Sequence, residues 1–286
     1  MSYNDFEIST QDGRPVALYL IEWGKTRWRY TSADRPITID EMVDGALVEV
    51  TYEPRAIKDS GMTQGQSSQN DLQIEGPGDL PIVRLYRGSA PTESIWLTVR
   101  RRHYDDVERA APIYWKGTVW NVRRPTPGRC SIVGKPLLAS LKRTGLRLCW
   151  TRECPHFLYD NQCRVDPEAW TVEGGVVGIS GDSIRVTPAT VKDAGWYRGG
   201  FASWTASDDG TLERRMIEID TLDEETGEVT LKLFGLVDFI AIGDAVKMYP
   251  GCDRTPGMCQ AKFNNLDNYG GFKDMPTESP FVGAIW

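Results

Sequence analysis

The sequence of 286 residues lacks the features of a membrane or secreted protein. No hydrophobic run approaches the roughly 20 residues that a membrane helix needs. The longest candidate, residues 233–246, is too short and contains Asp238 and Asp244. The N-terminus has no basic segment followed by an apolar run, so we expect no signal peptide and synthesis in a reducing cytoplasm.

A basic excess is also missing. Lysine and arginine number 33 against 40 aspartates and glutamates, giving a net charge of −7 and a pI near 5.1, which weighs against nucleic-acid recognition. The only two histidines are His103, which follows three arginines and is expected at the surface, and His156, expected to make an ordinary hydrogen bond in a loop. Neither lies beside a nucleophile motif, which argues against a cysteine peptidase. Forty acidic residues leave a glycosidase open.

Helical patterns are scarce, and short alternating segments rich in β-branched and aromatic residues dominate instead. They predict a mainly β fold in which antiparallel strands form barrels or sandwiches. One helix is predicted at residues 135–143, a mobile polar loop at 57–77, and ordered coil at 251–286. The predicted strands lie within residues 16–23, 46–54, 81–88, 94–102, 113–124, 169–188, 195–206, 212–223 and 228–235.

Four of the six cysteines form two separated pairs. Cys154 and Cys163 enclose eight residues, Cys252 and Cys259 enclose six, and about ninety residues lie between the pairs. In a reducing compartment such thiols favour a metal centre over disulfides. Structural zinc sites usually use tighter C-x2–4-C pairs, so the longer spacing favours an iron–sulfur cluster, with zinc and disulfides or free thiols as alternatives. Cys130 and Cys149 are expected to be small buried residues.

At these residues the sequence resembles a known family. The segments CPHFLYDNQCRVDP (154–167), GWYRGGFASW (195–204) and GDAVKMYPGCDRTPGMCQAKFNNLDNYGGFKDMP (243–276) resemble phage tail hub proteins of the BR0599 and DUF2163 type, including the hub protein of bacterial gene transfer agents. The minor tail protein L of lambda-like phages has similar cysteine spacings. The resemblance is strong over residues 145–286 and weaker before them, where YEPRAIKDSG (52–61) looks family-like.

The resemblance implies a structural subunit that closes the distal tail tube and connects it to tip and receptor-binding components, without enzymatic activity. It implies that Cys154, Cys163, Cys252 and Cys259 hold a 4Fe–4S cluster that staples a β-rich, coil-heavy C-terminal domain. The expected division is an N-terminal β-rich hub domain, residues 1–147, and a C-terminal region, 148–286, with a barrel-like insert at about 168–248.

The implied partners are other copies of the chain, as a homotrimer, and neighbouring distal tail, tape measure and central tip or fibre proteins. The implied place is the virion tail tip, after synthesis in the cytoplasm of a bacterial host. Two alternatives stay open: a tail-associated cell-wall hydrolase, and a zinc-stabilised binding protein.

Overall fold

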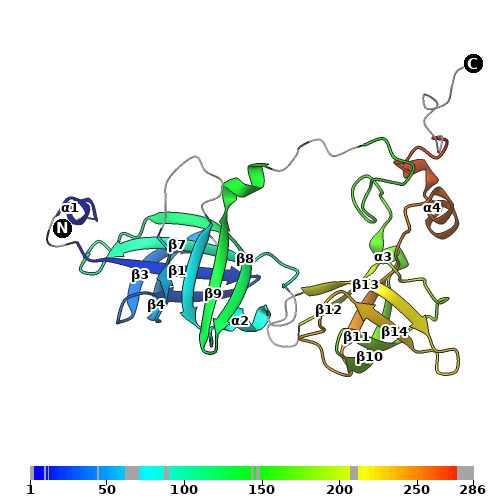
Figure 1. Cartoon of the computed structure of the whole chain (residues 1–286), viewed down its shortest axis with the longest axis horizontal. Coiled ribbons are helices and arrows are strands. Elements are labelled where there is room, and N and C mark those ends of the chain that lie inside the picture. The colour runs from blue at the N-terminus through cyan, green and yellow to red at the C-terminus, as the bar shows by residue number, and fades with distance from the viewer. Residues whose placement is uncertain are drawn as a thin grey trace, which may run out of the picture. The chain divides into compact units, whose positions relative to one another are not determined.

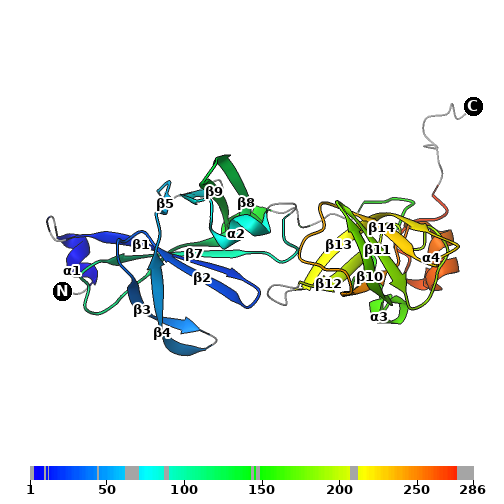
Figure 2. The same ribbon diagram turned by 90° about the horizontal axis from the view of Figure 1, so that it is seen from below.

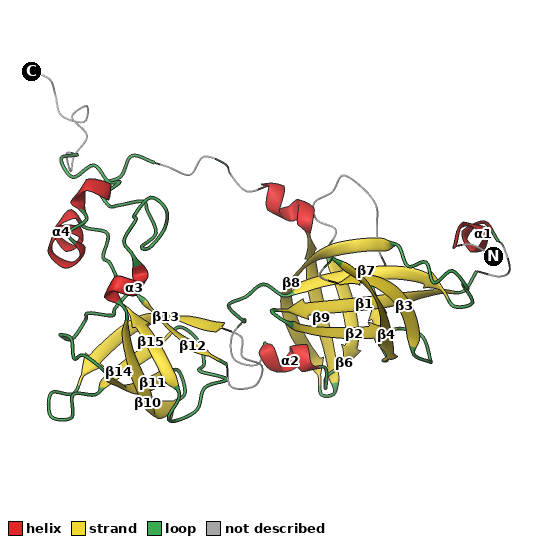
Figure 3. Ribbon diagram, turned by 180° about the vertical axis from the view of Figure 1, so that it is seen from behind, coloured by secondary structure: helices red, strands yellow, loops and turns green. Residues whose placement is uncertain are grey.

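A computed structural model describes residues 3–9, 11, 13–43, 45–61, 71–86, 90–142, 145, 149–206 and 212–275. The chain divides into two compact units, residues 1–143 and 144–286. Both are mainly β, as Figure 3 shows by the few helices that interrupt the strands. The predicted mainly β fold class is therefore confirmed. Within the described residues, no helix is long and apolar enough to span a membrane.

The first unit is built on a nine-stranded sheet in the order β3-β4-β2-β1-β7-β8-β9-β6-β5 (Figure 1). Neighbours pair antiparallel except β2 and β4, which meet in a short parallel pairing. The strands are β1 (Pro15–Trp23), β2 (Thr26–Thr31), β3 (Ile37–Val43), β4 (Ala46–Pro54), β5 (Lys58–Asp59), β6 (Leu72–Pro77), β7 (Trp96–His103), β8 (Ile113–Thr126) and β9 (Arg129–Pro136).

The β3–β4 hairpin extends away from the rest of this sheet (Figure 2). Its base contributes to a core cluster made of Leu18, Leu20, Ala33, Ile37, Ile39 and Tyr52. Its tip is exposed, with Leu47 69% and Met42 64% accessible to solvent. The short helix α1 (Tyr3–Ile8) lies against β7, where Phe6 stacks on His103.

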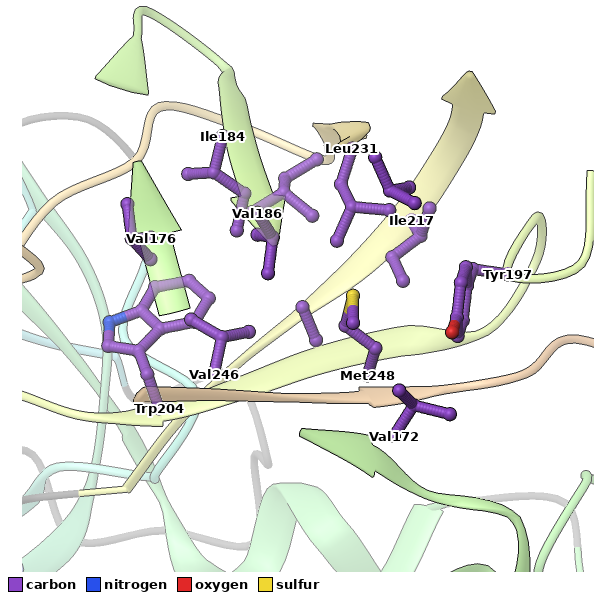
Figure 4. Packing of buried hydrophobic residues seen from close by; sticks show 13 residues of the cluster. Val172, Val176, Ile184, Val186, Tyr197, Trp204, Ile217, Leu231, Val246 and Met248 are labelled. Carbon is purple, nitrogen blue, oxygen red and sulfur yellow. The ribbon is translucent and has the colours of Figure 1, made fainter. Parts of the chain in front are cut away.

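In the second unit, six strands close into a barrel in the order β10-β11-β14-β13-β12-β15. They are β10 (Val172–Ser180), β11 (Ser183–Pro188), β12 (Phe201–Thr205), β13 (Leu212–Leu222), β14 (Val229–Leu233) and β15 (Ala245–Tyr249). Figure 4 shows the interior, where Val186, Trp204, Leu231 and Met248 face one another within a cluster of buried apolar residues. The alternation of buried and exposed residues along β11 and β14 produces this one-sided core.

Four local predictions are wrong. Residues 81–88 contain not a strand but the helix α2 (Pro81–Leu85), because Pro81 suits the first helical turn and the helix buries Ile82, Val83 and Leu85. The helix predicted at 135–143 is a 3-10 helix, η1 (Leu137–Lys142), whose leucines are exposed. The supposed loop at 57–77 begins with β5 and ends with β6, and its residues 62–70 lie outside the described chain. The supposed coil after 251 contains the helix α4 (Pro256–Phe263) and the 3-10 helix η2 (Leu266–Asn268).

Candidate metal centre

All four paired cysteines line one cavity of about 360 Å³ in the second unit. Cys154 and Cys163 lie in the loop that precedes α3 (Pro167–Trp170), Cys252 follows β15, and Cys259 lies on α4. Figures 1 and 3 show α3 and α4 at the same end of the barrel, and the rings of Trp170 and Phe263 meet edge to face at 5.3 Å. We call residues 150–166 and 250–275 the cysteine cap.

The first cysteine loop is held by one aspartate. The carboxylate of Asp160 accepts hydrogen bonds from the backbone N–H groups of Phe157, Gln162 and Cys163, at 3.0, 2.9 and 2.6 Å. Burial acts to raise the pKa of Asp160, but these three donors outweigh it and lower the pKa. The eight residues between Cys154 and Cys163 are therefore folded into a defined turn around a charged side chain.

The second pair is spaced by a capped helix. Thr255 is the N-cap of α4, and its hydroxyl accepts from the backbone N–H of Met258 at 3.2 Å. Pro256 occupies the first helical position, and Asn264 ends the helix in a left-handed conformation. This helix places Cys259 on its buried side, while Cys252 remains in the preceding extended segment.

Hydrogen bonds join the two cysteine segments directly. The backbone N–H of Cys154 donates to the carbonyl of Arg254 at 3.0 Å. The hydroxyl of Tyr269 donates to the carbonyls of Arg152 and Arg254, at 2.6 and 3.1 Å. The two pairs are thus brought together by backbone carbonyls and one tyrosine, although about ninety residues separate them in the sequence.

Tyr159 fastens the cap to the barrel. Its hydroxyl donates to the carbonyl of Pro250 at 2.8 Å, and its ring meets Phe201 and Tyr249 edge to face. Tyr159 has a φ of +70°, which is unusual for an aromatic residue. Arg164, Arg254 and Asn264 also have positive φ, so four of the six such non-glycine residues in the described chain belong to the cap. Strained backbone conformations of this kind persist where the surrounding contacts hold them in place, and they are common at functional sites.

Three glycines allow close contacts within the cap or between the cap and the barrel. A Cβ atom on Gly251 would lie 1.9 Å from the carbonyl oxygen of Arg198, and one on Gly200 would lie 2.0 Å from the carbonyl oxygen of Tyr249. The GWYRGG and PGC segments therefore cross backbone to backbone. A Cβ on Gly270 would collide with the ring of His156. Gly200 and Gly251 therefore allow the cap to approach the barrel closely.

The thiols interact electrostatically. Burial, followed by the charges of Cys252, Cys154 and Cys163, raises the pKa of Cys259 to about 11. Burial is also the largest cause that raises the pKa of Cys252, to which Asp253, Cys163 and Cys154 add. Cys252 and Cys259 therefore resist ionisation unless positive charge is placed beside them, as a bound metal centre would do.

Hydrogen-bond donors already point at three of the sulfur atoms. The backbone N–H of Gly270 donates to Cys154 Sγ at 3.4 Å, and that of Arg254 donates to Cys252 Sγ at 3.3 Å. The side-chain amide of Asn265 donates to Cys163 Sγ at 3.8 Å. Arg214, Arg215 and Arg254 also line the cavity, with Arg215 paired to Glu213 at 3.0 Å. These donors would stabilise negative charge on the sulfur atoms once a metal centre is bound.

The residues present fit a polynuclear iron–sulfur cluster. Cysteine thiolates are its usual ligands, and four of them line this cavity. Thiolates on a single zinc ion must all lie about 2.3 Å from it. As placed among the described residues, no group of three or more His, Cys, Asp or Glu side chains could hold one metal ion. The cavity's volume gives room for a larger group.

The other candidate residues have mixed outcomes. Cys130 is buried, as expected, and its thiol donates to the carbonyl of Pro77 at 3.2 Å. Cys149 is exposed, so its predicted burial is wrong. His103, predicted at the surface, is only 3% exposed, because α1 covers it and places Glu7 Oε1 3.0 Å from its Nε2. His156 lines the cavity, and its buried Nδ1 has no hydrogen-bond partner among the described residues.

Sequence reasoning missed the residues that shape the site around the thiols, chiefly Asp160, Tyr159, Asn265 and Gly270. Local signals existed for some of them. An aspartate three residues before Cys163 is typical of a side-chain-capped turn. The run T-P-G-M-C from Thr255, ended by Asn264, has the residues of a capped helix.

Comparisons with known proteins agree with the motifs. Residues 195–279 match the family model described as "Phage conserved hypothetical protein BR0599". No curated protein matches. A chain in the solved structure "Virion of native gene transfer agent (GTA) particle" has the same fold, with a TM-score of 0.74, 19% identity, and coverage of 99% of this chain and 94% of that one. The resemblance to BR0599-type phage proteins is confirmed.

Proposed function

We propose that this chain is a structural, non-enzymatic subunit of a phage or phage-like virion, located at the tail tip. There it closes the distal tail tube and connects it to tip and receptor-binding components. We also propose that Cys154, Cys163, Cys252 and Cys259 bind a 4Fe–4S cluster. The observation that carries the cluster proposal is that four cysteines from two distant segments line one cavity.

The virion assignment is supported by two independent likenesses. The matched family is described as a phage protein, and the match includes Cys252, Cys259 and the GWYRGG segment. The fold match covers almost the whole of both chains, so both units of this chain take part in it. The matched chain belongs to a virion particle. A shared two-unit architecture is what we expect of subunits that fill equivalent places in related assemblies.

The cysteine residues would act mechanically. When bound, a cluster supplies a cross-link among the Cys154–Cys163 loop, the Cys252 segment and α4. Hydrogen bonds to the side chains of Asp160 and Thr255 fix the local turns. The ring of Tyr159 packs the cross-linked cap against the barrel. The cap would then present a fixed surface to neighbouring proteins, although it has little regular secondary structure.

The partners that we propose are further copies of the chain, as a homotrimer, and the neighbouring distal tail, tape measure and central tip or fibre proteins. Two features support protein partners. Exposed apolar side chains lie on the tip of the β3–β4 hairpin, and others lie on the barrel at Phe234 and Ile242, 66% and 69% exposed. Native mass spectrometry of the purified chain would count the copies.

Metal analysis tests the cluster. Protein purified without oxygen should be brown, absorb near ~400 nm and contain about four iron and four acid-labile sulfide per chain. Cys154→Ser and Cys252→Ser should each lose most of the iron, whereas Cys130→Ser, outside the cavity, should keep it. A colourless protein with about one zinc per chain, or mass-spectrometric evidence of disulfides between these cysteines, would overturn the cluster.

Two experiments test the role in the particle. Gold labelling of a tagged chain in assembled particles should mark one end of the tail, the end away from the capsid. Labelling along the tail or on the capsid would contradict the proposed place. A zymogram on cell-wall substrate should show no cleared band, and a cleared band that co-purifies with the chain would favour the hydrolase.

A further inference from the structure

One asparagine contacts a cysteine from each pair. The side-chain Nδ2 of Asn265 donates to the carbonyl oxygen of Cys163 at 2.6 Å and to its sulfur at 3.8 Å. The backbone N–H of Asn265 donates to the carbonyl of Cys259 at 3.2 Å, and its own carbonyl accepts from the Cys259 thiol at 3.3 Å. Asn265 therefore links the first cysteine loop to the end of α4.

A second asparagine fixes the orientation of this amide. Asn268 Nδ2 donates to Asn265 Oδ1 at 2.7 Å, within the turn that η2 forms. Because Oδ1 accepts from Asn268, the Nδ2 group of Asn265 must face Cys163. The opposite orientation would set Oδ1 against the Cys163 carbonyl oxygen and Nδ2 against another donor, with both hydrogen bonds lost. Both asparagines line the cysteine cavity.

Cys163 differs from its neighbours in the source of its donor. Cys154 and Cys252 receive backbone N–H groups, from Gly270 and Arg254. Cys163 receives a side-chain N–H, which a substitution can remove without changing the backbone. Hydrogen bonds to the sulfur ligands withdraw electron density from an iron–sulfur cluster and raise its reduction potential, because they stabilise the more negative reduced form.

We infer that Asn265, oriented by Asn268, is a positioning residue that holds Cys163 against Cys259 and sets the reduction potential and retention of the metal centre. The inference deepens the proposed function and rests on the cluster that it assigns. A turn that only stabilised the fold would need no side-chain donor directed at the sulfur. The amide of Asn265 has two hydrogens, and they serve the carbonyl and the sulfur of the same ligand.

The test compares two adjacent substitutions that change charge equally. Asn265→Asp keeps the shape of the side chain and the acceptor for Asn268, but it replaces the donor with a negative oxygen. Asn264→Asp is the control, because Asn264 is exposed and its Oδ1 accepts from Gln260 Nε2, as a carboxylate also would. Asp also tolerates the left-handed φ of +47° at this position.

Potential and cluster retention are the measurements. In redox titrations followed by electron paramagnetic resonance, Asn265→Asp should have a lower reduction potential than the unsubstituted protein, and Asn264→Asp should not. With an iron chelator, Asn265→Asp should lose its visible absorbance about 10-fold faster or more, as supporting contacts of ligands usually imply. Asn268→Ala should shift both readouts in the same direction by a smaller amount.

Each outcome decides a different claim. If the unsubstituted protein contains no iron, the proposed cluster itself is wrong. If it contains the cluster and Asn265→Asp matches Asn264→Asp in potential and chelation rate, the role of Asn265 is overturned. If Asn265→Asp takes up no iron, although its metal-free form has the same melting temperature as the metal-free unsubstituted protein, the role of Asn265 is supported. If that metal-free form melts lower, Asn268→Ala decides, and unchanged potential and retention in it would overturn the inference.

Discussion

The barrel and the cysteine cap of the second unit are stabilised by different means. The barrel closes all six strands on each other and buries a cluster of thirteen residues, including Trp204, Ile217 and Leu231. In the cap, the buried hydrophobic side chains of the described residues are Val165, Cys259 and Phe263. In place of apolar burial the cap has side-chain-capped turns and thiols that line one cavity, although four of its residues adopt backbone conformations that cost free energy. A segment of this kind needs a cross-link where the barrel does not.

The folded barrel also reduces the stabilisation that a cross-link between the two cysteine pairs can contribute. Cross-linking an unstructured span of about ninety residues would restrict the unfolded chain by about 4–5 kcal/mol in the loop-closure picture. In the folded barrel, β10 already pairs with β15, with Val172 opposite Met248. The remaining open path from Cys163 to Cys252 then resembles a loop of about 15 residues, worth about 3 kcal/mol. We therefore expect the proposed metal centre to order the cap and to leave the barrel nearly unchanged.

The largest effect should come from the barrel core. Trp204→Ala removes an indole that is 2% exposed, and it should lower the free energy of unfolding of the second unit by about 3–5 kcal/mol. Phe234→Ala is the control, since Phe234 is 66% exposed and its loss should change stability by less than about 0.5 kcal/mol. Urea titration followed by circular dichroism measures both. Equal midpoints would show that the barrel does not carry the unit's stability.

The second-largest effect should come from removing the proposed cluster, which should affect the cap but not the barrel. Chelation of the metal should raise amide hydrogen exchange in residues 154–163 and 252–270, by up to the equivalent of about 3 kcal/mol. Amides of β11 and β14 should keep their protection, because these strands pair with each other and contribute no residue to the lining of the cysteine cavity. Exchange that rises equally in barrel and cap would refute the division between them.

A substitution at Gly251, where the backbone of the cap crosses that of the GWYRGG segment, should have a smaller effect on stability. Gly251→Ala places a Cβ where the carbonyl of Arg198 lies, so the cap must shift from the barrel at a cost of about 1–3 kcal/mol. Gly257→Ala is the matched control, because nothing lies within 4 Å of its Cβ position and alanine favours the helix α4. Thermal unfolding of the protein purified without oxygen should show a lower midpoint for the first variant and an equal or higher midpoint for the second.

The fold was predictable where the sequence alternates over many residues. β1, β4, β8 and β13 were found from their period-two patterns, and residues 172–249 form the barrel near the predicted insert. The prediction missed β2, β3 and β9, whose charged residues and Gly134 weaken the pattern. The helix α2 was mistaken for a strand because five residues are too few to separate the two periods. Burial against the sheet decides such short segments, and burial depends on distant residues.

For the site, the sequence supplied the four thiols but not their surroundings. Cysteine pairs can be recognised in a sequence because few other residue types bind metals or form cross-links. The roles of Asn265 and Gly270 depend on approach from loops more than a hundred residues away, at Cys163 and His156. Lys262 illustrates the same limit, because nothing in its neighbours indicates that a lysine on α4 is 8% exposed.

Lys262 leads to the last prediction, on how the cap is tied to the barrel. Its ammonium group donates to the carbonyls of Trp196 and Gly251, at 2.5 and 2.9 Å, and lies 4.4 Å from the centre of the Trp196 ring. Lys262→Met keeps the length of the side chain but leaves both carbonyls without this donor. It should destabilise the second unit by about 1–3 kcal/mol. Lys247→Met, which loses only exposed ion pairs with Glu168 and Glu173, should cost about 0–1 kcal/mol.

The pH dependence separates a buried ammonium group from simple packing. Burial lowers the pKa of Lys262 in the folded protein. Between this lowered pKa and the unfolded value near 10.4, the unfolded chain binds more protons, so folding gains stability as the pH rises. The difference in unfolding free energy between the unsubstituted protein and Lys262→Met should therefore widen toward high pH. A constant difference would show that burial does not lower the pKa of Lys262, and a narrowing one would show that the folded protein favours the charged ammonium form over the neutral amine.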